Sequence, residues 1–137
     1  MFCSYAATEI VGEEKELRNS SSVVFTASIS GYNNVAPANG IYGTSKSALS
    51  TYMKYAALEL AGKGIRCNAV QPGRINTPLI SNRLLSEEDV TKDIEQYPMK
   101  RYGKPEEVAH AIIYLLSDAS AWVTGTNLVI DGGRSLK

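Results

Sequence analysis

The chain of 137 residues is long enough for one domain with a buried core and too short for two. Its 14 basic and 14 acidic residues cancel, so we expect no basic surface of the kind that binds nucleic acid. No apolar run reaches the ~20 residues of a membrane-spanning helix, and the first residues do not form a leader peptide, so we expect a cytoplasmic protein without membrane contact.

The first part of the chain predicts a helix, a strand and a loop. Residues 2 to about 17 favour a helix that ends in a charged run. After a polar stretch, residues 22–27 are apolar and β-branched, which is typical of a strand, and they lead into Ser28. Residues 29–40 are rich in glycine, asparagine and proline and therefore predict a loop.

A long helix and a second strand are expected next. Residues 41–60 have a helical stripe that two following glycines should end, formed by Tyr42, Lys46, Leu49, Met53, Ala57 and Leu60. Residues 65–70 predict the second strand, and the Pro72–Gly73 pair should stop it. Cys67 lies inside that strand, so we interpret it as a small core residue.

The last part predicts two helical segments and a third strand. Residues 78 to about 96 favour a helical excursion over an opening. Pro105 suits the first position of a helix, whose apolar side should contain Val108, Ile112, Leu115 and Leu116. Residues 127–130 predict a strand. Strands that alternate with helices predict an α/β fold with a parallel sheet, in one domain over residues 1–137.

Metal binding is not expected from the sequence. Cys3 and Cys67 match neither a disulfide framework nor the spacing of a metal site. His110 is the only histidine and has no cysteine or histidine partner at ligand spacing. We therefore interpret His110 as a structural or surface residue.

Tyr42 and Lys46 are candidate catalytic residues because a spacing of four places them on one face of the helix. A phenol titrates near 10 in water and is a poor proton donor or acceptor at neutral pH, but a neighbouring cation favours its ionised form. A tyrosine beside a lysine can therefore serve as general acid or base on a substrate oxygen. The alternative is a tyrosine at the edge of the core beside a solvated lysine, since this spacing is common.

Ser28 is the third candidate. It stands at the carboxyl end of a strand that we expect to be buried, where open α/β sheets place their ligand sites. The loop that follows returns the chain to Tyr42, so both hydroxyls are expected to face one opening. A serine at the end of a strand is otherwise an ordinary turn residue.

Several segments, in order, resemble the short-chain dehydrogenase/reductase family, and they cover nearly the whole chain: 23–31, 42–46, 66–77, 101–109 and 124–133. The resemblance implies the C-terminal part of a Rossmann-like, doubly wound parallel sheet, with about three strands and flanking helices. It also implies that the N-terminal dinucleotide-binding strands are missing. Before the first predicted strand the only glycine is Gly12, whereas the family has a Gly-x-x-x-Gly-x-Gly turn there.

The resemblance also implies roles for the candidate residues. Tyr42 would exchange a proton with a carbonyl or alcohol, and Lys46 would hold the nicotinamide ribose and promote ionisation of the phenol. Ser28 would orient the substrate oxygen, with Ser30 as the alternative. Asn68 would fix local backbone.

The same resemblance implies a cofactor, NAD or NADP, and a small carbonyl or alcohol substrate. Pro72, Gly73, Ile75 and Thr77 would line the nicotinamide, although a proline–glycine turn followed by a helix cap also explains these residues. The family's catalytic asparagine would fall just upstream of Met1. Segment 79–97 would cover the substrate.

The family further implies a homo-oligomer, a tetramer or a dimer. Without the missing strands, the strand that leads to Ser28 would keep an unpaired edge, so the chain alone should be unstable or associate and bind dinucleotide weakly. A catalytically silent remnant that can only self-associate is therefore the alternative function. A nucleotide-sugar epimerase is disfavoured because such chains continue into a substrate domain, whereas this one stops soon after Asp131-Gly132-Gly133.

Overall fold

The computed structural model describes residues 21–33, 39–78 and 86–137. The helix expected at 2–17, Cys3, Gly12 and the segment 79–85 lie outside these residues. In chain order the elements are β1 (Ser21–Thr26), η1 (Ile29–Gly31), α2 (Gly40–Ala61), β2 (Ile65–Pro72), α4 (Glu87–Glu95), α5 (Pro105–Leu116), η2 (Asp118–Ser120), β3 (Asn127–Ile130) and η3 (Arg134–Leu136).

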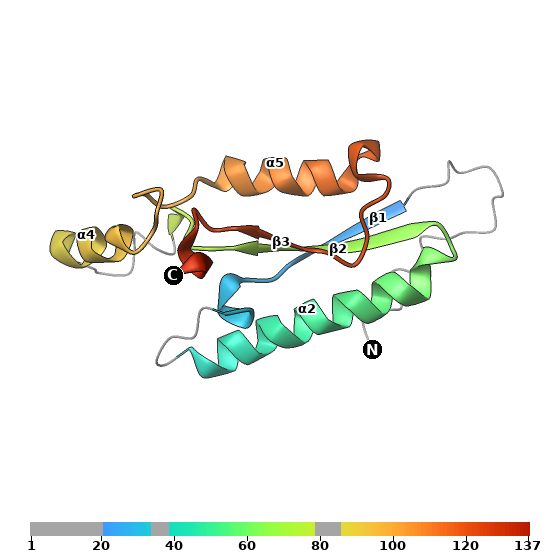
Figure 1. The fold of residues 1–137 in the computed structure, drawn as a ribbon, viewed down its shortest axis with the longest axis horizontal. Helices are drawn as coiled ribbons and strands as arrows, with labels where there is room; N and C mark the ends of the chain where they lie inside the picture. Colours follow the sequence, from blue (N-terminus) through green and yellow to red (C-terminus); the bar gives the residue numbers. More distant parts are fainter. Residues whose placement is uncertain (1–20, 34–38, 79–85) are drawn as a thin grey trace.

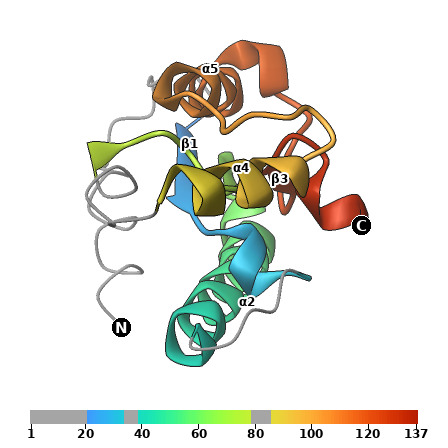
Figure 2. The same ribbon diagram turned by 90° about the vertical axis from the view of Figure 1, so that its left-hand side faces the viewer.

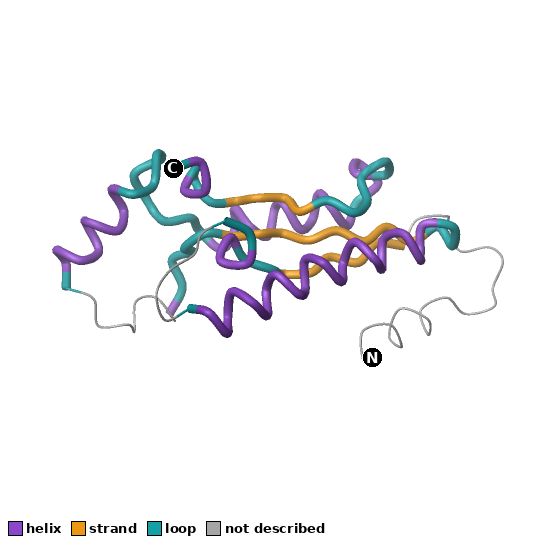
Figure 3. Tube along the Cα trace, turned by 60° about the horizontal axis from the view of Figure 1, so that its bottom comes forward, coloured by secondary structure: helices purple, strands orange, loops and turns teal. Residues whose placement is uncertain are grey.

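The strands form a three-stranded parallel sheet in the order β1-β2-β3, which confirms the predicted α/β fold. Helix α2 covers one face of the sheet and α5 covers the other (Figures 1 and 2). Figure 3 shows α2 running along the strands for most of its length. The central strand β2 is buried through Gln71, as expected for a strand covered on both faces.

The side chains of β2 alternate between the two helices. Ile65, Cys67 and Ala69 are buried in a core that includes Met53 and Ala57 of α2, which confirms the interpretation of Cys67. The apolar stripe of α2 was therefore correctly located over its central and C-terminal turns. Because successive side chains of a strand face opposite sides, the residues between them point toward α5.

Two of those intervening residues, Arg66 and Asn68, are polar and buried, and both bond to the segment from Leu115 to Thr126. The Arg66 Nη1 atom donates to the carbonyl of Leu115 at 2.9 Å and to Ser120 Oγ at 2.8 Å. Asn68 donates to the carbonyl of Val123 at 2.8 Å and accepts from the backbone N–H of Thr126 at 3.1 Å. These bonds attach the segment between α5 and β3 to the central strand.

Three details differ from the sequence prediction. β1 is half-buried, whereas we expected a buried strand, because among the described residues only β2 pairs with it. β2 extends to Pro72, since its last two residues pair with β3. Leu116 is 49% exposed because it is turned about 100° from Leu115, which faces the sheet.

The carboxyl ends of all three strands lie at one end of the sheet. The turn η1, the first turn of α2, helix α4 and the C-terminus gather at the same end (Figure 1). Open parallel sheets place their ligand sites at this end, so the fold brings the candidate residues to the expected place.

Candidate active site

Ser28 lies in the turn between β1 and η1 and is 8% exposed. Its backbone is extended, and its Oγ atom accepts from the backbone N–H of Ser30 at 3.2 Å, which caps η1. A hydroxyl that accepts one bond still has a proton to donate. Ser28 thus combines a structural cap with an O–H that can serve a ligand, while Ser30 contributes its backbone N–H to the cap.

The Ser28 turn packs directly against the start of α2, and two glycines permit the contact. A Cβ on Gly31 would lie 2.6 Å from the backbone carbon of Lys46, and one on Gly43 would lie 2.8 Å from the carbonyl oxygen of Ser30. Ser47 Oγ donates to the carbonyl of Gly31 at 2.5 Å. The structure therefore brings the Ser28 turn against the helical turns that carry Tyr42 and Lys46.

Tyr42 and Lys46 lie together at the start of α2. The Lys46 Nζ atom is 5.7 Å from the centre of the Tyr42 ring, and the Tyr42 side chain is 46% exposed. The same Nζ donates to the carbonyl of Thr26 at 2.9 Å. An ammonium has three N–H donors, so this bond leaves donors for other partners.

The carbonyl that Lys46 contacts belongs to the outer edge of β1. The neighbouring Ala27 N–H bonds the carbonyl of Val70, so the backbone groups of Ala27 face β2. In a parallel pair the peptide groups of successive residues face opposite sides, so those of Thr26 face away from β2. Lys46 therefore joins α2 to the side of β1 that faces away from β2.

The Pro72–Gly73 turn is held against the end of β3. The Gly73 N–H donates to the carbonyl of Ile130 at 3.0 Å, and a Cβ on Gly73 would lie 2.9 Å from that of Asp131. Ile75 forms an isolated parallel bridge with Gly103. The bonds of that bridge use the backbone on either side of Ile75, so its own N–H and C=O point to the opposite side. Thr77, two residues further, is half-buried.

Sequence and structure comparisons agree on one family. A family model described as enoyl-(acyl carrier protein) reductase matches residues 2–135. The chain is 41% identical over 116 residues to cyclohexanol dehydrogenase of Acinetobacter sp. and 42% identical over 116 residues to a 3-oxoacyl-[acyl-carrier-protein] reductase of Thermotoga maritima. Each alignment covers 85% of this chain.

Solved structures give the same answer. A short-chain type dehydrogenase/reductase from Mycobacterium ulcerans matches 87% of the chain with a TM-score of 0.81 and 36% identity. Aldohexose dehydrogenase of Thermoplasma acidophilum matches all of it with a TM-score of 0.83 and 32% identity. The chain belongs to the short-chain dehydrogenase/reductase family. It spans 44% and 46% of the two curated relatives and 43% and 56% of the two structures, about half of their lengths.

This short-chain dehydrogenase/reductase chain also has a hollow that is not lined by Ser28, Tyr42 or Lys46 but lies next to the Pro72–Gly73 turn. It is lined by Arg74, Met99, Arg101, Gly103, Glu107, Ile130, Asp131 and Gly132. Its charged groups are paired: Arg74 with Asp93, and Arg101 with Glu107, while Asp131 accepts from two backbone N–H groups. The charged side chains that line the hollow are therefore already occupied by partners within the chain.

Among residues 21–33, 39–78 and 86–137 no group of three or more His, Cys, Asp or Glu side chains could hold a metal. His110 is exposed on α5, and burial raises the pKa of the Cys67 thiol. Within the same ranges, no helix has both the length and the apolar character to cross a bilayer.

Proposed function

We propose that this chain supplies the proton-transfer and nicotinamide-facing part of an NAD(P)-dependent oxidoreductase that interconverts a carbonyl and an alcohol. The observation that carries the proposal is the docking of the Ser28 turn onto the helical turns of Tyr42 and Lys46. This docking supports a site at the carboxyl end of the parallel sheet that uses two hydroxyls and a cation, in what we propose is one partial Rossmann-like domain over residues 1–137.

Each residue has a distinct part in the proposed reaction. In reduction, the Tyr42 hydroxyl donates its proton to the carbonyl oxygen of the substrate, and in oxidation the phenolate takes the proton from the alcohol. The buried Ser28 hydroxyl donates a hydrogen bond to the same oxygen and fixes its position. The Lys46 ammonium lies beside the Tyr42 ring, so a substrate that is bonded to the Tyr42 hydroxyl lies near this positive charge.

The residues of this chain fit one end of the cofactor. The donors that Lys46 has left after bonding Thr26 suit the ribose hydroxyls next to the nicotinamide. Pro72, Gly73, the outward backbone of Ile75 and Thr77 suit the nicotinamide itself. NAD or NADP, when bound, supplies or accepts the hydride. The described residues contain no glycine-rich turn that leads into a helix for the pyrophosphate, so we expect weak binding by the chain alone.

The substrate is proposed only as a class. Relatives with similar identity are named for cyclohexanol, for glucose and for 3-oxoacyl carrier protein. The Ser28 and Tyr42 hydroxyls would suit any of these substrates, because they would bind the reacting carbonyl or alcohol oxygen and not the rest of the molecule. We therefore propose a small-molecule substrate with that group.

A chimera tests the proposal directly. Residues 1–137 would replace the matching part of the Thermotoga maritima relative, so that its remaining half completes the fold. We expect dinucleotide-dependent carbonyl reduction that Tyr42→Phe lowers at least ~100-fold, the usual contribution of a general acid. Tyr55→Phe is the matched control, because Tyr55 is an exposed tyrosine of the same helix. A folded chimera without activity, or equal effects of both variants, would sink the proposal.

A second candidate function is a silent remnant that only self-associates, and exposed apolar side chains favour it. On α2, Ile41 and Leu58 are 93% and 81% exposed, and beyond α5 Trp122 is fully exposed. Such surfaces are typical of subunit contacts, so we propose a homo-oligomer for either function. We also propose that the protein is cytoplasmic. Sedimentation of the chain and of Leu58→Glu tests the contact. We expect the variant to sediment as a smaller species, and an unchanged species would contradict the contact through α2.

A further inference from the structure

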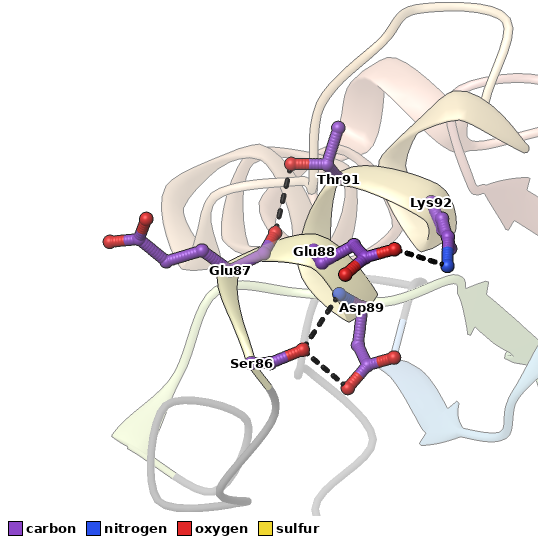
Figure 4. A network of polar contacts seen from close by, with 6 residues as sticks. All are labelled: Ser86, Glu87, Glu88, Asp89, Thr91 and Lys92. Carbon is purple, nitrogen blue, oxygen red and sulfur yellow. Dashed lines mark hydrogen bonds and ion pairs between the residues drawn. The ribbon is translucent and has the colours of Figure 1, made fainter.

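Helix α4 is stable only while it is attached to the rest of the molecule. None of its residues is buried, and its nine residues are fewer than the ~12–15 that a helix needs to persist in isolation. Two interactions stabilise the helix internally (Figure 4). The Ser86 hydroxyl caps its first turn by accepting from the backbone N–H of Asp89 and donating to the Asp89 carboxylate, and Lys92 pairs with Glu88 at 2.7 Å. These bonds order the helix but do not join it to the sheet.

One ion pair and two tyrosines join α4 to the Pro72–Gly73 turn, and we call them the Arg74 latch (Arg74, Asp93, Tyr97 and Tyr102). A separate bond joins Gln96, which follows α4, to Arg134 of η3. Arg74 Nη1 lies 2.7 Å from Asp93 Oδ2 of α4, with side chains 30% and 22% exposed. The Tyr97 hydroxyl accepts from the backbone N–H of Arg74 at 3.3 Å, and the Tyr97 ring stands beside Gly73. The ring of Tyr102 lies 5.7 Å from the Arg74 guanidinium and meets the Tyr97 ring edge-on.

The latch is partly shielded from water, which distinguishes it from the surface pair in the same helix. Burial opposes the charge of Arg74, but Tyr102 and Asp93 outweigh it and raise the pKa of the guanidinium, so Arg74 stays charged. The Lys92–Glu88 pair has the same length, yet its side chains are 68% and 76% exposed. Exposed pairs of this kind contribute little. The two pairs therefore form a matched comparison inside one helix.

We propose that Arg74 is a positioning residue that couples α4 to the Pro72–Gly73 turn, so that helix and turn move as one body. Arg74 directly follows that turn, and the ion pair of the latch joins Arg74 to α4. Coupling of this kind is reciprocal. Given the proposed function, on which this consequence rests, a nicotinamide held at the turn stabilises α4, and a substrate held by α4 stabilises the turn.

Hydrogen exchange of the full chain, read by mass spectrometry, tests the latch without any ligand. Asp93→Ala breaks the latch, and Glu88→Ala breaks the surface pair. Alanine favours helix in both, so faster exchange cannot come from lower helix propensity. We expect Asp93→Ala to speed exchange of residues 87–95 at least tenfold and that of α5 less than twofold, whereas Glu88→Ala changes 87–95 about twofold or less.

Equal effects of the two variants, or equal acceleration in α4 and α5 by Asp93→Ala, would overturn the latch. If Asp93→Ala fails to fold, a double variant with the two charges swapped, Arg74→Asp with Asp93→Arg, tests the latch instead. We expect slow hydrogen exchange in α4 to be restored in this variant, because the ion pair can form again. A purely steric role of the two side chains would not be restored by the swap. Added NADH then separates the two proposals. No binding by saturation-transfer NMR counts against the proposed function alone, whereas binding without slower exchange in α4 overturns the coupling alone.

Discussion

Helix α4 and the first turn of α2 lie at the same end of the sheet, but the two helices are held in place by different forces. α2 has 22 residues and buries Met53, Ala56 and Ala57 against the sheet. α4 has nine residues, buries none and is joined to the body by the Arg74–Asp93 ion pair. A helix that is held by apolar burial does not depend on any one pair of charges. A helix that is held by an ion pair is released when the pair breaks and is held again when the pair re-forms. The difference assigns a fixed role to the helix with the proposed catalytic residues and a movable role to α4.

Removal of the apolar anchor of α2 should have the largest effect. Met53 is fully buried, so Met53→Ala should cost about 2–5 kcal/mol of unfolding free energy through lost burial and the cavity left behind. Urea unfolding followed by circular dichroism measures this change. A loss below about 1 kcal/mol would mean that α2 is not held by its apolar face, and the contrast with α4 would fail.

A smaller effect is expected where α2 meets the Ser28 turn. Gly43→Ala places a Cβ 2.8 Å from the carbonyl oxygen of Ser30, and the resulting shift should cost about 1–3 kcal/mol. The matched control is Gly40→Ala, because nothing lies within 4 Å of a Cβ at Gly40 on the same helix. The two unfolding midpoints should separate clearly. Equal midpoints would show that the turn does not press on α2.

The counterpart in α4 should be local. Ser86→Ala removes the cap of α4 and should cost that helix about 1 kcal/mol. Because α4 buries no residue, the urea midpoint of the whole chain should stay within error while exchange of residues 87–95 becomes several-fold faster. A shift of the global midpoint as large as that of Gly43→Ala would show that α4 belongs to the cooperative core.

Much of this architecture could be predicted from the sequence, because periodicity and turn residues act locally. The stripe through Met53 and Ala57 located the buried face of α2, and the proline at 105 located the start of α5. The spacing of Tyr42 and Lys46 was enough to put them on one helix face. These features depend on residues a few positions apart, where geometry follows from the helix or strand itself.

Contacts between distant segments could not be predicted in the same way. The bond from Lys46 to the Thr26 carbonyl and the Arg74–Asp93 pair join residues 20 and 19 positions apart, and both depend on how elements dock. The close contacts made by two glycines could not be predicted either. A Cβ on Gly31 would meet Lys46 and Ser47, and one on Gly43 would meet Ser30, but a sequence shows only that glycine is there and not which neighbour requires it.

The start of α5 lies between these extremes, because charge holds this end and Leu115 is buried at the other. Arg101 and the backbone N–H of Lys104 lower the pKa of Glu107 from 4.5 to about 2. A lowered carboxyl pKa stabilises the fold above the unfolded value, and this contribution is lost as pH falls through the folded value. The thermal midpoint of the wild type should therefore drop between pH 4.5 and about 2 more than that of Glu107→Gln, with Glu106→Gln as the control from the same helical turn. If the Glu106 and Glu107 variants have the same acid profile, charge does not hold this end of α5, and its position must come from Leu115 alone.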